Sequence, residues 1–172
     1  MSNKQMVINP YYGISKEDIF QEVKNMASNQ LFECDIIIPS VSNVNNKPSY
    51  FLQEAQKVFP NLLGLDVYGE QKLGTNKYIE LARHKSNRIF FCNMFCEKYR
   101  KNKRNINYLS FFTCLLNLRE TCYQSRKQND KTIKIHCRKD AFGINNKLGG
   151  KWSTISDIMS DCLNGIEVIL HV

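Results

Sequence analysis

The sequence predicts a single three-layer α/β domain, in which helices cover both faces of a mixed, largely parallel sheet. Segments rich in β-branched and aromatic residues alternate along the chain with amphipathic segments of helical period. Strands and helices that alternate in this way form parallel sheets, because each helix returns the chain to the same edge. The 172 residues, 42% of them hydrophobic, suffice for one sizeable core and are few for two, so we expect one domain over 1–172.

The first half of the chain predicts two helices and several strands. A short strand is expected at 5–9, after which Pro10 and Gly13 break the chain. Ser15 with Asp18 resembles a capping box that opens a helix running to about residue 28. A buried strand at 35–38 is expected to end at Pro39, and the polar segment 40–49 to form a loop. A helix is then predicted at 50–58, before Pro60.

The rest of the chain predicts strands at 62–68, 77–82, 88–94, 132–137 and 167–171. The longest helix is expected from residue 107 to about 125. One stripe of it holds Phe111, Leu115, Leu118 and Cys122, and a wider apolar face adds Leu109, Phe112 and Leu116. A stripe this wide predicts burial against the sheet. A last helix follows Trp152, with apolar residues at helical spacing.

The net charge of +8 favours an anionic partner, and much of the excess lies in residues 98–104. We interpret this cluster as a solvated loop between a strand and a helix. Nucleic-acid binding is the alternative, but no motif that reads bases accompanies the charge, so we do not expect it. The sequence has no signal-peptide pattern and no apolar run long enough for a membrane span. We therefore expect a cytoplasmic protein with no membrane partner.

Seven cysteines occupy mostly apolar positions of the predicted elements, which is typical of reduced thiols in a core. A zinc site is the alternative that would give the cysteines a function. Cys92 and Cys96 do not form a zinc-binding pair, however, and the three histidines are scattered along the sequence. We predict neither a metal site nor a cofactor.

Residues 142–152 are the most informative segment, because together with the strand predicted at 132–137 they predict a strand, a glycine loop and a helix in succession. Gly149 and Gly150 tolerate positive φ, and the loop directs backbone N–H groups and the positive end of a helix to one place. This geometry suits a phosphate or pyrophosphate. The pattern matches neither the dinucleotide fingerprint nor the P-loop, so a plain connector is an equal alternative.

From Asp35 to Val172 the chain resembles a macro domain of the small bacteriophage type, which binds ADP-ribose or processes ADP-ribose-1''-phosphate. The similar segments, in the order of the family, are DIIIPSVSN (35–43), VFP (58–60), LG (73–74), RIFFCNMF (88–95), RNINYLSF (104–111) and KIHC with FGINNKLGGKW (134–152). Residues 1–34 lie outside the resemblance. The resemblance implies a macro-like fold with a ligand crevice at the carboxyl ends of its strands, where open α/β sheets bind ligands in general.

The resemblance also implies the residues of the site. The first ligand segment contains Ser42, Asn43, Asn45, Asn46 and Lys47, with Asn43 bonded to the distal ribose. The second contains Phe142, Gly143, Asn145, Asn146, Lys147, Leu148, Gly149 and Gly150, whose backbone cradles the diphosphate. Structural alternatives stay open: Asn43 as a turn cap, Phe142 as core, and the two last glycines as a close helix–strand contact.

The first ligand segment differs from the glycine-rich loop of the family, because Asn45, Asn46 and Lys47 carry side chains. The acidic residue that the family places near adenine is also missing beside Asn9. No histidine or carboxylate lies next to Asn43 in sequence, so no general base is predicted. We expect a module that captures an ADP-ribosyl nucleotide. A hydrolase for ADP-ribose-1''-phosphate or an ADP-ribosyl linkage is the alternative.

Overall fold

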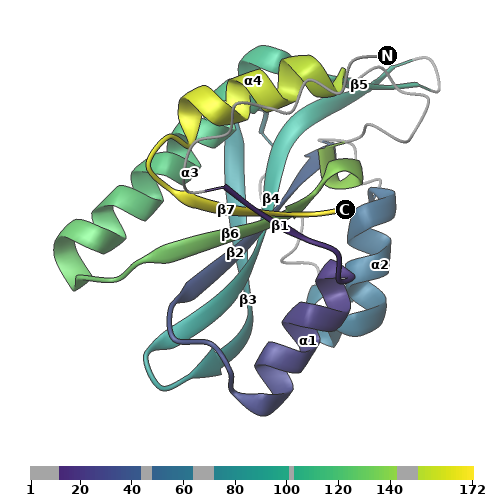
Figure 1. The fold of residues 1–172 in the computed structure, drawn as a ribbon. Helices are drawn as coiled ribbons and strands as arrows, with labels where there is room; N and C mark the ends of the chain where they lie inside the picture. The colour runs from purple at the N-terminus through teal and green to yellow at the C-terminus, as the bar shows by residue number, and fades with distance from the viewer. Residues whose placement is uncertain (1–11, 44–47, 64–71, 101–102, 143–150) are drawn as a thin grey trace.

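The computed structural model describes residues 12–43, 48–63, 72–100, 103–142 and 151–172, and these form one sheet covered on both faces by helices (Figure 1). The sheet has seven strands in the order β1-β7-β6-β2-β4-β3, with β5 paired to β4. The strands are β1 (Tyr12–Ser15), β2 (Asp35–Asn43), β3 (Thr75–His84), β4 (Asn87–Arg100), β5 (Lys103–Ile106), β6 (Ile133–Arg138) and β7 (Glu167–His171). The pairs from β1 to β4 are parallel, whereas β3 and β5 run antiparallel to β4.

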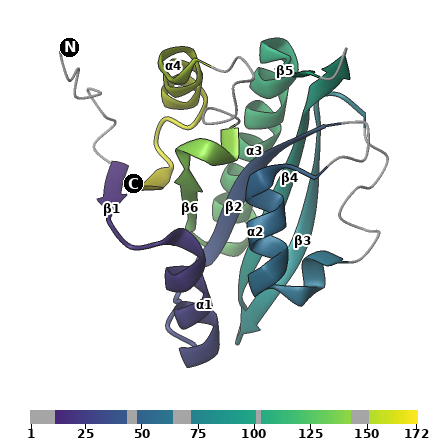
Figure 2. The ribbon, with the colours of Figure 1, turned by 90° about the vertical axis from the view of Figure 1, so that its right-hand side faces the viewer.

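The helices lie on opposite faces of this sheet (Figures 1 and 2). One face carries α1 (Ile19–Asn29) and α2 (Tyr50–Val58), and the other carries α3 (Tyr108–Asn129) and α4 (Trp152–Cys162). Two short 3₁₀ helices, η1 (Pro60–Leu63) and η3 (Lys139–Phe142), follow α2 and β6. The predicted three-layer α/β fold with a largely parallel sheet is thus confirmed.

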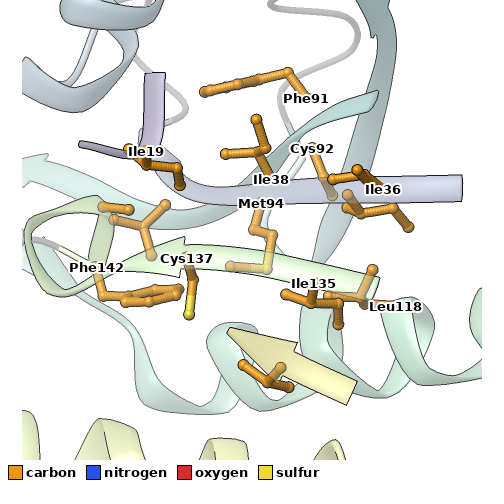
Figure 3. Close-up of a cluster of buried hydrophobic side chains, with 14 of the residues drawn as sticks. Ile19, Ile36, Ile38, Phe91, Cys92, Met94, Leu118, Ile135, Cys137 and Phe142 are labelled. Atoms are coloured by element: carbon orange, nitrogen blue, oxygen red, sulfur yellow. The ribbon is translucent and has the colours of Figure 1, made fainter. Parts of the chain in front are cut away.

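The central strands are apolar on both faces, as strands buried between helix layers require. Figure 3 shows Ile19, Ile38 and Phe91 on one side of the sheet, and Leu118 and Phe142 on the other. On the α2 face the rings of Phe51 and Phe91 stack at 6.1 Å. On the α3 face Phe111 meets Phe142 edge to face at 6.0 Å. The predicted stripe of α3 is buried, as expected.

The wider apolar face predicted for α3 is wrong. Leu109, Phe112 and Leu116 are 76%, 41% and 38% exposed. The sheet covers one stripe of this helix, and α4 adds too little cover to bury the flanks, so these side chains stay at the surface.

Several predicted boundaries are also wrong. Pro39 does not end β2, which continues to Asn43. β2 pairs with β6 only at Asp35–Ile37. Pro39 lies beyond this pairing, so its missing backbone N–H interrupts no hydrogen bond on the β6 side of the strand. Residues 62–63, predicted to begin a strand, belong to η1, and 64–68 lie outside the described residues.

The basic cluster at 98–104 is not a loop between a strand and a helix. β4 extends to Arg100 and β5 begins at Lys103, so the charged residues build an antiparallel hairpin. Its strand content has no obvious sequence signal, because lysine and arginine are depleted in strands.

The amino-terminal predictions need two further corrections. The strand predicted at 5–9 lies outside the described residues, and Gly13 does not break the chain, because it lies within β1 at the sheet edge. Asp18 is not part of a capping box begun by Ser15. It is itself the N-cap of α1, and its carboxylate accepts from the backbone N–H groups of Phe20 and Gln21 at 3.0 and 3.1 Å.

The prediction for the cysteines is confirmed: all seven are free, and all but the half-buried Cys34 are buried. Burial raises the pKa of the Cys137 thiol to about 12, which keeps it protonated and unreactive. Within the described part of the chain, no helix combines the length and the apolar character that crossing a bilayer requires.

Candidate functional site

The candidate site lies at the carboxyl edge of the parallel strands. β2 and β6 are neighbours in the sheet and run in the same direction, so their carboxyl ends lie at the same edge. β2 ends at Asn43, and β6 continues into η3, which contacts β2 and ends at Phe142. The two segments that the sequence predicts as ligand loops therefore leave the described fold from adjacent positions, although they are separated by about a hundred residues.

Buried polar residues lie within the carboxyl halves of β2 and β4. Ser40, Ser42, Asn93 and Glu97 are 0%, 2%, 0% and 3% exposed. We call these four residues the polar strip. Ser40 and Asn93 are direct partners in the parallel register, two residues beyond the pair of Ile38 and Phe91. Because side chains alternate between faces, this pair lies on the face covered by α2.

Ser42 has the clearest unused hydrogen-bonding capacity of the polar strip. Its Oγ is buried and has no hydrogen-bond partner among the described residues. A buried hydroxyl without a partner costs free energy, and native proteins retain few of them. Such a group next to a predicted ligand segment is a candidate contact for a polar ligand.

The structure adds Glu97, which the sequence analysis missed. The register of β2 and β4 shifts between Ser42 and Asn43, so that Asn43 is the partner of Glu97 instead of Cys96. This bulge brings a buried carboxylate beside Asn43, at the beginning of the first ligand segment. Bulges of this kind re-aim strand residues and are common next to functional sites. The sequence signal was an acidic residue at the end of an otherwise apolar strand.

Phe142 lies in the core. It is fully buried and packs against Phe111 and, at 6.5 Å, against Trp152. The alternative interpretation of this residue as core thus accounts for the contacts of its ring, and its contact with a ribose stays a prediction. Its neighbourhood includes two lysines: Lys139 Nζ lies 5.0 Å from the Trp152 ring centroid, and the backbone N–H of Lys151 donates to Tyr108 Oη at 3.1 Å.

Arg138, at the end of β6, joins both helices of the α1/α2 layer to the sheet. Its guanidinium donates to Asp140 at 2.6 Å, to Glu54 at 2.7 Å and to Asp18 at 3.3 Å. It also lies over the rings of Phe20 and Phe51, at 5.4 and 5.2 Å. Burial acts against the charge, but the hydrogen bonds that Arg138 donates to Asp140 and Glu54 outweigh it and raise the pKa of Arg138. Arg138 is therefore a permanent cation at the centre of three carboxylates.

Two histidines lie on the same side of the sheet. Although scattered in sequence, His136 on β6 and His171 on β7 place Nδ1 and Nε2 only 3.0 Å apart. Both are buried. Burial, followed by the neighbouring His171, lowers the pKa of His136 to about 4, so this imidazole is neutral at physiological pH. Two of the three histidines that are scattered along the sequence are thus in direct contact in the fold.

Of the predicted site residues, the structure describes Ser42, the backbone of Asn43, and Phe142. The remaining predicted residues lie outside the described residues: Asn45, Asn46, Lys47, Gly143, Asn145, Asn146, Lys147, Leu148, Gly149 and Gly150. Their roles stay predictions.

One solved structure is similar over nearly the whole chain. It is the crystal structure of a protein from Bacteroides thetaiotaomicron, determined by the Northeast Structural Genomics Consortium. The similarity has a TM-score of 0.59 and 17% sequence identity, and covers 93% of this chain and 97% of that chain. At this identity it shows the three-layer α/β fold and carries no function. No protein-family model and no curated protein matches the chain.

Proposed function

We propose that the protein binds ADP-ribose or a related ADP-ribosyl nucleotide at the carboxyl edge of β2, β4 and β6. The observation that carries the proposal is the adjacency of β2 and η3, from which the segments 44–47 and 143–150 begin. These are the segments to which the macro-domain resemblance assigns the distal ribose and the diphosphate. Ligands of open α/β sheets bind at this edge on general grounds.

The composition of the edge supports a sugar nucleotide as the ligand. Ser42 offers a buried hydroxyl, and Glu97 offers a carboxylate that can accept hydrogen bonds from ribose hydroxyls, as acidic residues do in dinucleotide sites. The glycines at 149–150 precede α4, whose first turn supplies backbone N–H groups suited to phosphate oxygens.

We further propose that the protein captures its ligand without rapid turnover. Capture of this kind would let a bacteriophage protein sequester a nucleotide signal of host defence in the host cytoplasm. The side chains of Asn45, Asn46 and Lys47 replace a glycine-rich loop where hydrolysis requires an ordered water. Lys47 then adds a cation for an anionic substituent on the distal ribose.

One observation favours hydrolysis as a second candidate. Glu97 is a buried carboxylate opposite Asn43 in the register, which is where a general base for an attacking water would be needed. Multiple-turnover release of phosphate or ADP-ribose that disappears in both Asn43→Ala and Glu97→Gln would make the protein a hydrolase. Single-equivalent binding without product release supports capture.

Thermal shift and calorimetry with ADP-ribose, its 1''-phosphate and NAD test the proposal. A ligand at about 100 times its dissociation constant stabilises the folded state by roughly 2.7 kcal/mol, which for a domain of this size raises Tm by roughly 5–10 °C. Gly149→Val and Gly150→Val should abolish the shift and leave the fold intact, because a side chain blocks the approach of the backbone to phosphate. Gly165→Ala, at φ 81° in the turn before β7, controls for the strain that a side chain causes at a glycine: it should lower Tm but keep the shift caused by the ligand. Unchanged binding in both valine variants would show that the loop is only a connector.

A further inference from the structure

Glu22, His136 and His171 bring potential metal ligands together from three elements. Glu22 lies in the first turns of α1, His136 on β6 and His171 on β7. One ligand atom from each residue can be chosen such that all lie within 4.8 Å of one another. Two imidazoles and a carboxylate form a donor set that binds Zn²⁺ and other first-row divalent metals.

The hydrogen bonds around His171 determine which of its nitrogens carries the proton. Nδ1 lies 3.0 Å from the carbonyl oxygen of Glu17 and 3.3 Å from Glu22 Oε2. Both neighbours are acceptors, so the proton belongs on Nδ1. The lone pair of Nε2 then points towards His136 Nδ1, 3.0 Å away.

This arrangement matches the way proteins support a metal-binding histidine. Such a histidine usually donates its other ring N–H to a carbonyl or a carboxylate, which fixes the ring and makes the binding nitrogen more basic. Here Glu17 and Glu22 provide both acceptors, and Glu22 is itself held by Ser15 Oγ, which donates to Oε2 at 3.1 Å. The support for one ligand is therefore already in place.

We propose that His136 Nδ1 and His171 Nε2 bind a divalent transition-metal ion such as Zn²⁺, with Glu22 orienting His171. The ion takes the place of the proton that the two nitrogens share in its absence. Two nitrogen ligands on tetrahedral Zn²⁺ lie roughly 3.3 Å apart, so the observed pair needs to open by a few tenths of an ångström, and the rings need to turn so that both lone pairs meet at the ion. The half-exposed Glu22, whose side chain is 26% accessible, marks the side from which an ion enters.

The ion would join α1 to the β6–β7 side of the sheet and does not depend on the nucleotide proposal. The two ligands and the residue that orients one of them come from positions 136, 171 and 22, so an ion that binds to the folded state alone stabilises it by mass action.

Zn²⁺ titration of the reduced, chelator-treated full chain against a chromophoric competitor tests this site. We expect one bound equivalent, which His136→Gln and His171→Gln remove. Glu22→Gln should weaken binding by about 10- to 100-fold, as loss of an orienting partner does. The third histidine provides the matched control, because His84 lies on β3 at the opposite edge, and His84→Gln should bind like the unmodified chain.

Cobalt spectroscopy separates this site from the cysteines and does not need the variants to fold. Co²⁺ bound to the two imidazoles should give visible d–d bands without a thiolate-to-cobalt charge-transfer band. A thiolate band, the absence of a bound equivalent, or full binding in folded His136→Gln and His171→Gln protein would each overturn the proposal. The pair would then be a hydrogen-bonded contact of the core.

Discussion

The carboxyl edge of the sheet has two halves, which differ in whether their polar side chains have hydrogen-bond partners. At β6 and β7, Arg138 and the histidines contact carboxylates and carbonyl groups of α1, α2 and η3 at hydrogen-bonding distances. At β2 and β4, the polar strip includes a buried hydroxyl, Ser42 Oγ, with no partner among the described residues. The first half is a saturated network that fixes helices onto the sheet. The second half retains hydrogen-bonding capacity that a ligand can use.

This difference separates stability from binding. Charged groups that satisfy one another contribute to the free energy of unfolding, and removing Arg138 leaves three carboxylates, which are only partly buried, without their cation. A buried hydroxyl without a partner adds no stabilising contact to the folded state, in which its burial costs free energy, and it gains a contact when a ligand arrives. Substitutions in the first half should therefore change stability, and substitutions in the second half should change affinity.

The largest effect is expected on the free energy of unfolding when acid protonates the pair of His136 and His171. The folded pKa of His136, about 4, is below the ordinary value of 6.5. Between these pH values the unfolded chain binds a proton that the folded chain lacks, so the free energy of unfolding falls as the pH is lowered through this window. The full loss is about 3 kcal/mol.

Urea unfolding of metal-free protein between pH 7 and 4 measures this loss, with His136→Gln as the comparison. The variant should show a shallower fall, since other groups titrate equally in both proteins. His84→Gln should keep the slope of the unmodified chain. Parallel pH profiles for the unmodified chain and His136→Gln would contradict the assignment.

Arg138→Met should give the next largest change, a destabilisation of about 2–3 kcal/mol. The substitution keeps the apolar contacts with Phe20 and Phe51 but leaves Asp140, Glu54 and Asp18 without their cation. Arg83→Met is the matched control: Arg83 forms a similar pair with Glu80 on exposed side chains, where a pair contributes less than about 1 kcal/mol. Equal losses in the two variants would show that the β6 network has no special role.

Ser42→Ala should change affinity and leave stability nearly unchanged, which is the opposite of the effect of Arg138→Met. Its stability should stay within about 1 kcal/mol of the unmodified chain, because no described contact is lost, while nucleotide affinity falls roughly 2- to 10-fold. Ser156→Ala controls for burial alone, since Ser156 donates to the Ser153 carbonyl within α4, away from the edge. If Ser42→Ala loses more stability than the control and keeps its affinity, Ser42 belongs with the residues that stabilise the fold.

The sequence predicted the elements whose pattern depends on burial, and missed those set by distant partners. The bounds of α2 and β7 were predicted correctly, and both elements bury apolar side chains in one core. Pro39 and the basic hairpin were misassigned, since strand pairing overrode local propensity. Glu97 beside Asn43 depends on a bulge, and the contact of His136 with His171 depends on strand order. Neither relation is visible in a linear sequence.

The smallest effect is expected at the β4–β5 hairpin. Lys98→Glu combined with Lys101→Glu and Arg104→Glu reverses much of the basic cluster, yet nucleotide affinity should stay within a few-fold. Charges in solvent are screened beyond about 10 Å at 0.1 M ionic strength, so the hairpin contributes to a general attraction for anions and little to a fixed contact. Calorimetry at low and moderate salt measures this, and any loss should shrink as salt rises. If the triple variant instead abolishes a tight, steeply salt-dependent affinity for RNA or DNA, the hairpin is a nucleic-acid interface and the anion that the net charge favours is a polynucleotide.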